Sequence, residues 1–316
     1  MVLAPADGIV EEIADGIPDN KIGDVNLIDN WGNTVVVKHS DYLFSSLSHL
    51  KAGTFKVKVG DVVKKGQVLA LVGNSGRSPE PHLHMQLQSS KYIGSKTIDF
   101  PIAYYLADNG REVEFKSFSR PMKDETVSVI PGNTLVKNAF HFIPGKKLEF
   151  EAGNATESWE VRTNIYNQSF LFCEKTQSRA WFVMDDEVFY FRHFEGDKNS
   201  LLYDFFISAY RIHLGYYKGI RIEDSYATDL LYRGFPLLLQ DFVAPFAVYL
   251  RGLFSMQYVK IDDEMNPSEL EIETHTVCKV LGRKKRSKSA RIIIDREGIK
   301  CFRIDKQQNT IEVTRR

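Results

Sequence analysis

Residues 54–87 read TFKVKVGDVVKKGQVLALVGNSGRSPEPHLHMQL, and this stretch decides the fold that the sequence predicts. Phe55, Val57 and Val59 alternate with polar residues, which is the pattern of a strand with one buried face. The following run, GQVLALVG, is a continuous apolar segment bounded by glycines, as expected for a strand buried on both sides. Because no helical period interrupts these runs, the stretch predicts an antiparallel unit of short strands.

The end of the same stretch, HLHMQL, brings two histidines into one expected strand. Successive side chains of a strand point to opposite faces, so His82, His84 and Gln86 are expected on one face and three apolar residues on the other. At a rise of about 3.3 Å per residue, the two imidazoles lie roughly 6.6 Å apart along the strand. This spacing predicts half of a metal site, and it also occurs where two histidines simply face solvent.

The sequence on both sides of this stretch extends the β pattern. GIVEEI and NTVVVKH each follow a turn sequence and indicate further strands. Residues 97–110 are expected to add a closing strand and one helical turn. Prolines at 121 and 131 then indicate a linker, so a boundary is expected near residue 115, between a first domain at 1–115 and a second at 120–316.

The second domain is expected to be α+β. Five aromatic-rich segments between residues 147 and 194 indicate a meander of strands, and apolar residues at helical spacing predict a helix within 200–214. More helix is expected within 226–256, and the segments 290–305 and 310–316 return to strands. The predicted fold class is therefore mainly β: an antiparallel β-sheet or half-barrel, followed by an α+β domain with a β-meander.

Composition excludes several classes of protein. The 316 residues include 41 basic and 41 acidic side chains, and this balance argues against a dedicated nucleic-acid binder. Cys173, Cys278 and Cys301 are too few for a disulfide framework; buried free thiols are expected, with a Cys278–Cys301 bridge as the alternative. No signal peptide is visible. The apolar stretch 234–256 contains Asp241, Pro245 and Arg251, so it predicts buried helix rather than a membrane span.

Four blocks in order carry a resemblance to a known family: APADGIV (4–10), WGNTVVVKH (31–39), the segment 47–78, and PEPHLHMQL (79–87). They resemble the lysostaphin-like, or LytM-type, zinc endopeptidases, over about residues 2–100 and not beyond. The resemblance implies a zinc cofactor (Zn2+) and, as substrate, the stem or cross-link peptides of bacterial peptidoglycan. It also implies a place in the bacterial cell envelope or periplasm, where other envelope proteins would be further partners.

The same resemblance implies roles for individual residues. His84 matches the zinc ligand, and His82 matches the catalytic imidazole that hydrogen-bonds the reacting water or oxyanion. His49 matches the other active-site histidine, which helps to orient or deprotonate that water. Zinc would lower the pKa of its bound water to about 7, and the histidines would transfer protons near neutral pH. The turns at Gly32-Asn33 and at 73–76 match those that shape the groove floor.

The sequence departs from the family at the metal site. The family's other two ligands, a His and an Asp in an HxxxD motif, precede the APADG turn, and the chain starts too close to that turn to hold them. Since a catalytic zinc usually keeps three protein ligands, the chain is expected to be inactive as it stands. It would be either a fragment whose ligand pair lies upstream or a degenerate member. The presence of all three active-site histidines favours the fragment.

Other acidic and histidine residues near these motifs are expected to be structural. His193 and Asp197 repeat the HxxxD spacing on an expected surface loop, where it is read as coincidence. Asp7 occupies the turn itself, His39 is read as structural, and His141, His213 and His275 share no motif. Leu47-Ser48 replace the family's Tyr-Ala, which removes a substrate contact.

Two other functions stay open. The KVKVGDVVKKGQVLALV segment also resembles a lipoyl- or biotinyl-type barrel-sandwich hybrid, although Lys38 lies on an expected strand and not on the exposed hairpin that a swinging arm needs. The other is a non-catalytic wall-binding or regulatory module, with residues 120–316 as the binding part. Their aromatics are expected to form core, and the basic run at 283–288 is expected at a solvated hairpin tip, where it could meet anionic envelope polymers or lipid headgroups.

Overall fold

The computed structural model describes every residue of the chain except Arg233, Gln307 and Gln308. It contains two compact units, Met1–Pro101 and Ile102–Arg316, each with its own sheets. All strand pairs are antiparallel and helices are few and short, so the prediction of a mainly β chain is confirmed.

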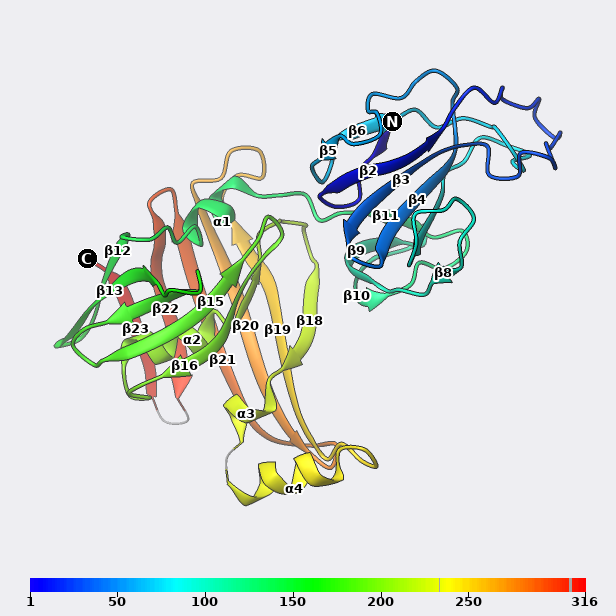
Figure 1. Ribbon diagram of the computed structural model, residues 1–316. Helices are drawn as coiled ribbons and strands as arrows, with labels where there is room; N and C mark the ends of the chain where they lie inside the picture. The colour runs from blue at the N-terminus through cyan, green and yellow to red at the C-terminus, as the bar shows by residue number, and fades with distance from the viewer. Residues whose placement is uncertain (233, 307–308) are drawn as a thin grey trace. The chain divides into compact units, whose positions relative to one another are not determined.

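The first unit is built on a six-stranded sheet in the order β5-β2-β3-β4-β7-β8, with a separate pair, β1 and β6. Its central strands β2, β3 and β4 lie side by side at the blue end of the ribbon (Figure 1). The strand bounds are β1 Val2–Leu3, β2 Gly8–Ala14, β3 Asn33–Ser40, β4 Leu43–Leu50, β5 Val62–Val63, β6 Val68–Ala70, β7 His84–Gln88 and β8 Thr97–Ile98.

The two faces of this sheet differ in polarity. Val35 and Val37 of β3 pack with Leu47 of β4 in one buried cluster, at the two-residue period of a strand. The opposite face carries Thr34 and Ser48, whose hydroxyl oxygens are 2.9 Å apart. Because Ser48 pairs with His84 of β7, the polar face continues onto the strand of the two histidines.

One strand prediction in this unit is wrong, and a second is confirmed only in part. Residues 54–60 form no strand and join no ladder. Val57 is buried, whereas Val59 is 59% exposed. In the run GQVLALVG only 68–70 form a strand, β6, which pairs with the two-residue β1. Leu71 and Val72 lie beyond that short pair and are 40% and 37% exposed.

The second unit contains a three-stranded sheet, β10-β9-β11, and a twelve-stranded sheet. In the large sheet β23 lies between β12 and β22, and so joins the meander β12–β16 to the ladder β18–β22 (Figure 1). The expected meander and the expected C-terminal strands are both confirmed. The strands are β9 Ile102–Asp108, β10 Val113–Ser119, β11 Thr126–Ser128, β12 Lys147–Ala152, β13 Ala155–Thr163, β14 Ser169–Cys173, β15 Ser178–Met184, β16 Val188–Glu195, β17 Arg211–His213, β18 Arg221–Tyr226, β19 Leu250–Ile261, β20 Glu269–Val280, β21 Arg283–Asp295, β22 Gly298–Lys306 and β23 Asn309–Arg315.

Short helices connect these strands: α1 Thr134–Ala139, α2 Leu201–Ser208, α3 Thr228–Leu231 and α4 Phe235–Val243. The helix predicted within 200–214 begins as expected, because the Ser200 hydroxyl accepts a hydrogen bond from the Tyr203 amide at 3.1 Å. It ends at Ser208, since Ile212 pairs with Phe189 of β16 and draws the chain into β17. The expected helix within 226–256 is present only as α3 and α4.

The expectation of a buried helix at 234–256 is wrong. The buried residue of α4 is Gln240, whereas the apolar side chains are half-buried or exposed, and Phe235, Leu238 and Phe242 are the most exposed. In the described part of the chain, no helix is long and apolar enough to cross a membrane.

Aromatic side chains form the core of the second unit, as expected. Trp159 lies 4.5 Å from Phe150 and 5.4 Å from Phe205 between ring centroids, and all three are fully buried. The three cysteines are buried free thiols. A Cys278–Cys301 bridge is excluded because β21 separates the two strands that carry them.

The structure divides the chain after Pro101, earlier than the expected boundary near residue 115. Residues 102–108 form β9 and pair with β10, so the helical turn expected within 97–110 is absent. Leu106 of β9 packs into the aromatic core of the second unit, which explains why this hairpin belongs to it.

Candidate functional site

Three imidazoles lie close together on the polar face of the six-stranded sheet. His49 stands near the end of β4, His82 lies just before β7, and His84 is the first residue of β7. The ring centroid of His49 is 4.7 Å from that of His82 and 6.0 Å from that of His84. The structure therefore brings together all three residues that the sequence singles out, from two neighbouring strands and the loop between Ser75 and β7.

The backbone holds His49 in a conformation that non-glycine residues rarely adopt. Its φ angle is +64°, its amide donates to the Trp31 carbonyl at 3.2 Å, and its carbonyl accepts from the Gly73 amide at 3.0 Å. The ring Nδ1 lies 2.8 Å from the Ser75 carbonyl oxygen. Because a carbonyl can only accept, Nδ1 carries the proton and Nε2 of the neutral ring keeps its lone pair.

Burial lowers the pKa of His49 below its ordinary value of 6.5. The hydrogen bond to Ser75 acts in the opposite direction, and the neighbouring His82 and His84 lower the pKa further. His49 is thus a neutral base at neutral pH, with its acceptor nitrogen defined by the Ser75 contact.

His82 is oriented in the same way by its own loop. Its Nδ1 lies 2.9 Å from the Glu80 carbonyl oxygen and 3.0 Å from the Ser78 hydroxyl, which itself donates to Asn74 Oδ1 at 2.7 Å. The carbonyl again requires the proton on Nδ1, so the lone pair is on Nε2. The ring is exposed, and a molecule in solution can therefore reach it.

His84 has the opposite tautomer. Its Nε2 lies 3.1 Å from Gln86 Oε1, and the Gln86 amide nitrogen donates to Gln88 Oε1 at 2.8 Å and to the Ser95 carbonyl at 2.9 Å. These two donations fix which Gln86 atom is the oxygen, so His84 carries its proton on Nε2. Nδ1 is then the nitrogen available to a metal or a substrate. The Trp31 and His84 rings pack edge to face, with 5.0 Å between their centroids.

The packing of β7 reverses the sequence expectation. Gln86 and Gln88 are buried, while the apolar Leu83 and Met85 are each 39% exposed. The loop after β7 explains the reversal, because the Gln88 amide donates to the carbonyls of Ser90 and Tyr92 at 2.7 and 3.0 Å. The loop after β7 covers Gln86 and Gln88 on the polar face. The imidazoles are therefore held in place by hydrogen bonds and not by apolar packing.

Two crossing turns form the wall beside the imidazoles. Gly32 and Gly76 both have positive φ angles, +62° and +79°. A Cβ added to Gly76 would lie 2.4 Å from the Gly32 nitrogen, and a Cβ on Gly32 would lie 2.5 Å from the Ser75 carbonyl oxygen. The two turns that the sequence singles out are therefore in direct backbone contact, next to the carbonyl that orients His49.

The acidic residues near the site have structural partners. Asp7 accepts hydrogen bonds from Lys64 Nζ at 2.7 Å and from the Lys65 amide at 2.8 Å, and the Lys64 contact holds its pKa below the usual range. Asp15 accepts from the Gly53 amide at 2.9 Å. The ring of His39 bridges the Asp7 carbonyl and the Ser45 hydroxyl.

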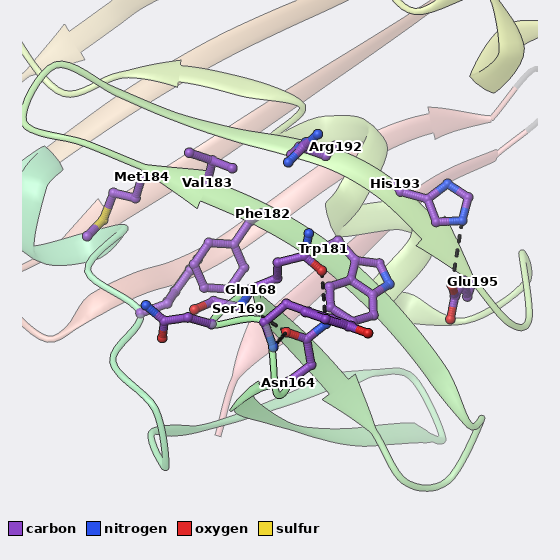
Figure 2. A pocket seen from close by; sticks show the side chains of 13 residues that line it. Asn164, Gln168, Ser169, Trp181, Phe182, Val183, Met184, Arg192, His193 and Glu195 are labelled. Atoms are coloured by element: carbon purple, nitrogen blue, oxygen red, sulfur yellow. Dashed lines mark hydrogen bonds and ion pairs between the residues drawn. The ribbon is translucent and has the colours of Figure 1, made fainter. Parts of the chain in front are cut away.

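The downstream HxxxD sequence does not form a metal site. His193 lies on β16, not on a loop, and lines a cavity of about 710 Å³ beside the β13–β14 turn. Figure 2 shows His193 pointing toward Glu195, with its Nε2 3.8 Å from Glu195 Oε1. Asp197 instead accepts the Asn199 amide at 2.9 Å, so the two ends of the motif have different partners.

The residues of this chain do not complete a zinc site by themselves. Within the described ranges, 1–232, 234–306 and 309–316, no three His, Cys, Asp or Glu side chains are arranged to hold a metal ion. His49 and His82 each use Nδ1 on a carbonyl, and His84 is the one ligand expected from the sequence resemblance. Since a catalytic zinc needs about three protein ligands, one matched ligand does not fit a resident zinc.

We expect His49 to titrate below pH 6.5, with its neutral form protonated on Nδ1. The unfolded chain then takes up this proton first on acidification. His49 therefore stabilises the folded state fully above pH 6.5, and the contribution is lost as the pH falls through the folded pKa. Long-range ¹H–¹⁵N NMR of the imidazoles across this pH range measures both properties. A midpoint at or above 6.5, or a proton on Nε2, contradicts the geometry.

Sequence reasoning did not identify the residues that orient the histidines. The strand pattern places Gln86 on the histidine face without indicating a role for it, and Trp31, Ser78 and Ser95 have no signal in the sequence. The alternation HxHxQ does put Gln86 next to His84 on one face. The carbonyls of Ser75 and Glu80 could not be found from residue types, since every residue has one.

Comparison with known proteins gives results for the first unit. Residues 1–98 match the model of Peptidase family M23. The peptidoglycan DD-endopeptidases ShyB and ShyC of Vibrio cholerae serotype O1 are 37% and 33% identical to the chain over 79 and 82 residues. These alignments cover 25% and 26% of this chain, and the chain spans 18% of each enzyme's length.

A solved structure is also similar: the catalytic domain of the prophage-encoded M23 protein EnpA from Enterococcus faecalis, with a TM-score of 0.25 and 24% identity. The alignment covers 31% of this chain and 65% of that one. The family match over residues 1–98 confirms the resemblance inferred from the sequence blocks for the N-terminal third of the chain.

Proposed function

We propose that this chain binds bacterial peptidoglycan and takes its stem or cross-link peptides as ligands, because residues 1–98 match the model of Peptidase family M23. The names of ShyB and ShyC, which are peptidoglycan DD-endopeptidases, support this substrate class. The proposed location is the cell envelope, where such peptides are found.

The observation that carries the proposal is the cluster of His49, His82 and His84. Each ring is oriented by an acceptor on the nitrogen that faces the protein, which leaves one lone pair on each neutral ring for a ligand. A peptide group next to the cluster would meet the Nε2 atoms of His49 and His82. Two imidazoles at this spacing suit the uptake and return of a proton during peptide hydrolysis.

Hydrolysis requires more than these three side chains. We infer that His84 contributes one zinc ligand and that a His and an Asp from another segment would have to supply the others. When bound, zinc would activate a water and polarise the peptide carbonyl. Without those ligands, His49 and His82 can bind and orient a peptide but cannot by themselves cleave it at an appreciable rate.

The incomplete ligand set also favours the second candidate, a non-catalytic module that binds wall peptides. The carrier-domain alternative has no support: Lys38 lies on β3 and forms an ion pair with Asp41 at 2.9 Å, so it is not on a free hairpin tip.

We expect the chain to co-sediment with purified sacculi and to release no peptides from them, with or without added zinc. Its zinc affinity, measured by titration, should be weaker than nanomolar. A His49→Ala/His82→Ala double variant should lose sacculus binding, whereas His275→Ala in the second unit, as a matched control, should keep it. Tight binding of one zinc with release of peptides would show that the ligand set is complete. Failure to bind sacculi would contradict the proposed substrate class.

A further inference from the structure

The helix α4 exposes most of its apolar side chains, together with Asp241, and buries Gln240. Phe235, Leu238 and Phe242 follow each other at helical spacing and are 74%, 67% and 82% exposed, and Phe246, just after the helix, is 91% exposed. A surface helix in water normally has the reverse arrangement. A contiguous apolar patch of this kind marks a contact with another apolar phase.

Gln240 fixes the helix in this orientation. It is 5% exposed; its side-chain nitrogen donates to the Ala247 carbonyl at 3.1 Å, and its oxygen accepts the amides of Tyr249 and Leu250, both at 2.8 Å. Tyr249 also donates its hydroxyl to the Pro236 carbonyl. Rolling the apolar face inward would break these bonds, so the exposure is built into the fold.

A basic segment lies beside this patch. The turn between β20 and β21 is joined to the α4 connection by the Leu281 amide, which donates to the Tyr249 carbonyl at 2.8 Å. Leu281 is 77% exposed, and the four basic residues 283–286 that follow are all exposed. Among the residues that the structure describes, no carboxylate forms an ion pair with these four. They directly follow the turn of the β20–β21 hairpin and open β21, so the basic run lies exposed at the end of a hairpin, as the sequence predicts.

We therefore propose that α4, Leu281 and the basic residues Arg283–Arg286 form an interfacial anchor that lies on an anionic phospholipid bilayer. Aromatic and aliphatic side chains would enter the boundary between headgroups and acyl chains, and the basic residues would contact lipid phosphates. Figure 1 shows α4 at one end of the large sheet, beside the start of β19, so the patch lies at one end of this unit.

Two other occupants fit the surface less well. An anionic wall polymer would match the basic residues but would leave the phenylalanines in water. In a symmetric dimer formed through this surface, the basic segments of the two copies would lie close together and repel each other. An anionic bilayer satisfies the apolar and the basic parts together. The proposal is independent of the peptidoglycan function.

The test is sedimentation of the full chain with vesicles of phosphatidylcholine containing about one-third phosphatidylglycerol, a fraction at which basic residues are attracted to the surface. We expect binding that weakens with added salt and is at least about tenfold weaker on pure phosphatidylcholine. Phe242→Ser/Phe246→Ser and Lys284→Glu/Lys285→Glu should each weaken binding by about tenfold or more.

Matched controls keep the result specific. Ile165→Ser/Tyr166→Ser removes equally exposed apolar side chains elsewhere in the second unit, and Lys147→Glu/Lys260→Glu changes the charge by the same amount; both should bind like the unaltered chain. Thermal unfolding checks that each variant is folded. The proposal is overturned if the chain does not bind anionic vesicles, or if the α4 variants bind as well as the controls. It is also overturned if the Phe242/Phe246 substitutions dissociate a dimer and leave vesicle binding unchanged.

Discussion

Gly76→Ala is expected to destabilise the N-terminal unit by about 3 kcal/mol or more, the effect of a forced left-handed conformation combined with a backbone clash. Gly76 has a φ angle of +79°, and an added Cβ would lie 2.4 Å from the Gly32 nitrogen and 2.8 Å from the carbonyl oxygens of Asp29 and Asn30. All three are backbone atoms, so no side-chain rotation can relieve the contact. The turn would have to move, and it carries the Ser75 carbonyl that orients His49.

Gly53→Ala is the matched control for this prediction. Gly53 lies in the same unit with a φ angle of +67°, but nothing lies within 4 Å of its expected Cβ. Gly53→Ala should therefore destabilise the unit only by the cost of placing alanine in a left-handed conformation, about 1 kcal/mol. Urea unfolding followed by the amide signals of the first unit measures both variants. Equal stability of the two would show that the contact between the Gly32 and Gly76 turns does not exist.

Glu157→Leu is expected to destabilise the second unit by about 3–5 kcal/mol, since it leaves buried donors without an acceptor. Glu157 is 7% exposed, and its two oxygens accept the amides of Leu201 and Leu202 at 2.9 and 3.1 Å. One of them also accepts the indole N–H of Trp159 at 2.9 Å. The carboxylate thus caps the N-terminus of α2, where a negative charge is favourable, and joins it to the aromatic core.

Two variants separate this role from general disruption. Glu157→Gln keeps the shape but turns one acceptor into a donor, and it should have a smaller effect of the same sign. Glu160→Gln breaks an ion pair with Arg162 on the same strand, and its effect should be within about 1 kcal/mol. Urea unfolding followed by tryptophan fluorescence measures all three. A Glu157→Leu chain as stable as Glu160→Gln would contradict the assigned role.

How much the sequence predicts depends on whether an interaction uses residue types or backbone atoms. The β-branched run of β3 predicts a strand of the sheet, and the HxH sequence places two imidazoles on one face because side chains of a strand repeat every two residues. The pairing of His49 with Ser75 and of His82 with Glu80 uses carbonyls, which leave no trace in the sequence. These tertiary contacts decide the tautomers.

The prediction of a buried helix at 234–256 is wrong for a related reason. The apolar stretch 234–256 predicts burial, yet one polar residue, Gln240, occupies the inner position of α4 with three hydrogen bonds. The strand predicted at 54–60 is absent because an alternating pattern indicates burial of one side of a segment and not the presence of a neighbouring strand. The observed domain boundary precedes the predicted one because Leu106 packs into a core formed by residues distant in the sequence.

The most direct test of the central claim is NMR of the histidine rings while a cross-linked peptidoglycan peptide is added to the intact chain. If the cluster on β4 and β7 is the peptide site, the signals of His49, His82 and His84 should shift together with one dissociation constant, and those of His141, His213 and His275 should stay in place. A response confined to histidines of the second unit, or none at all, would contradict the account.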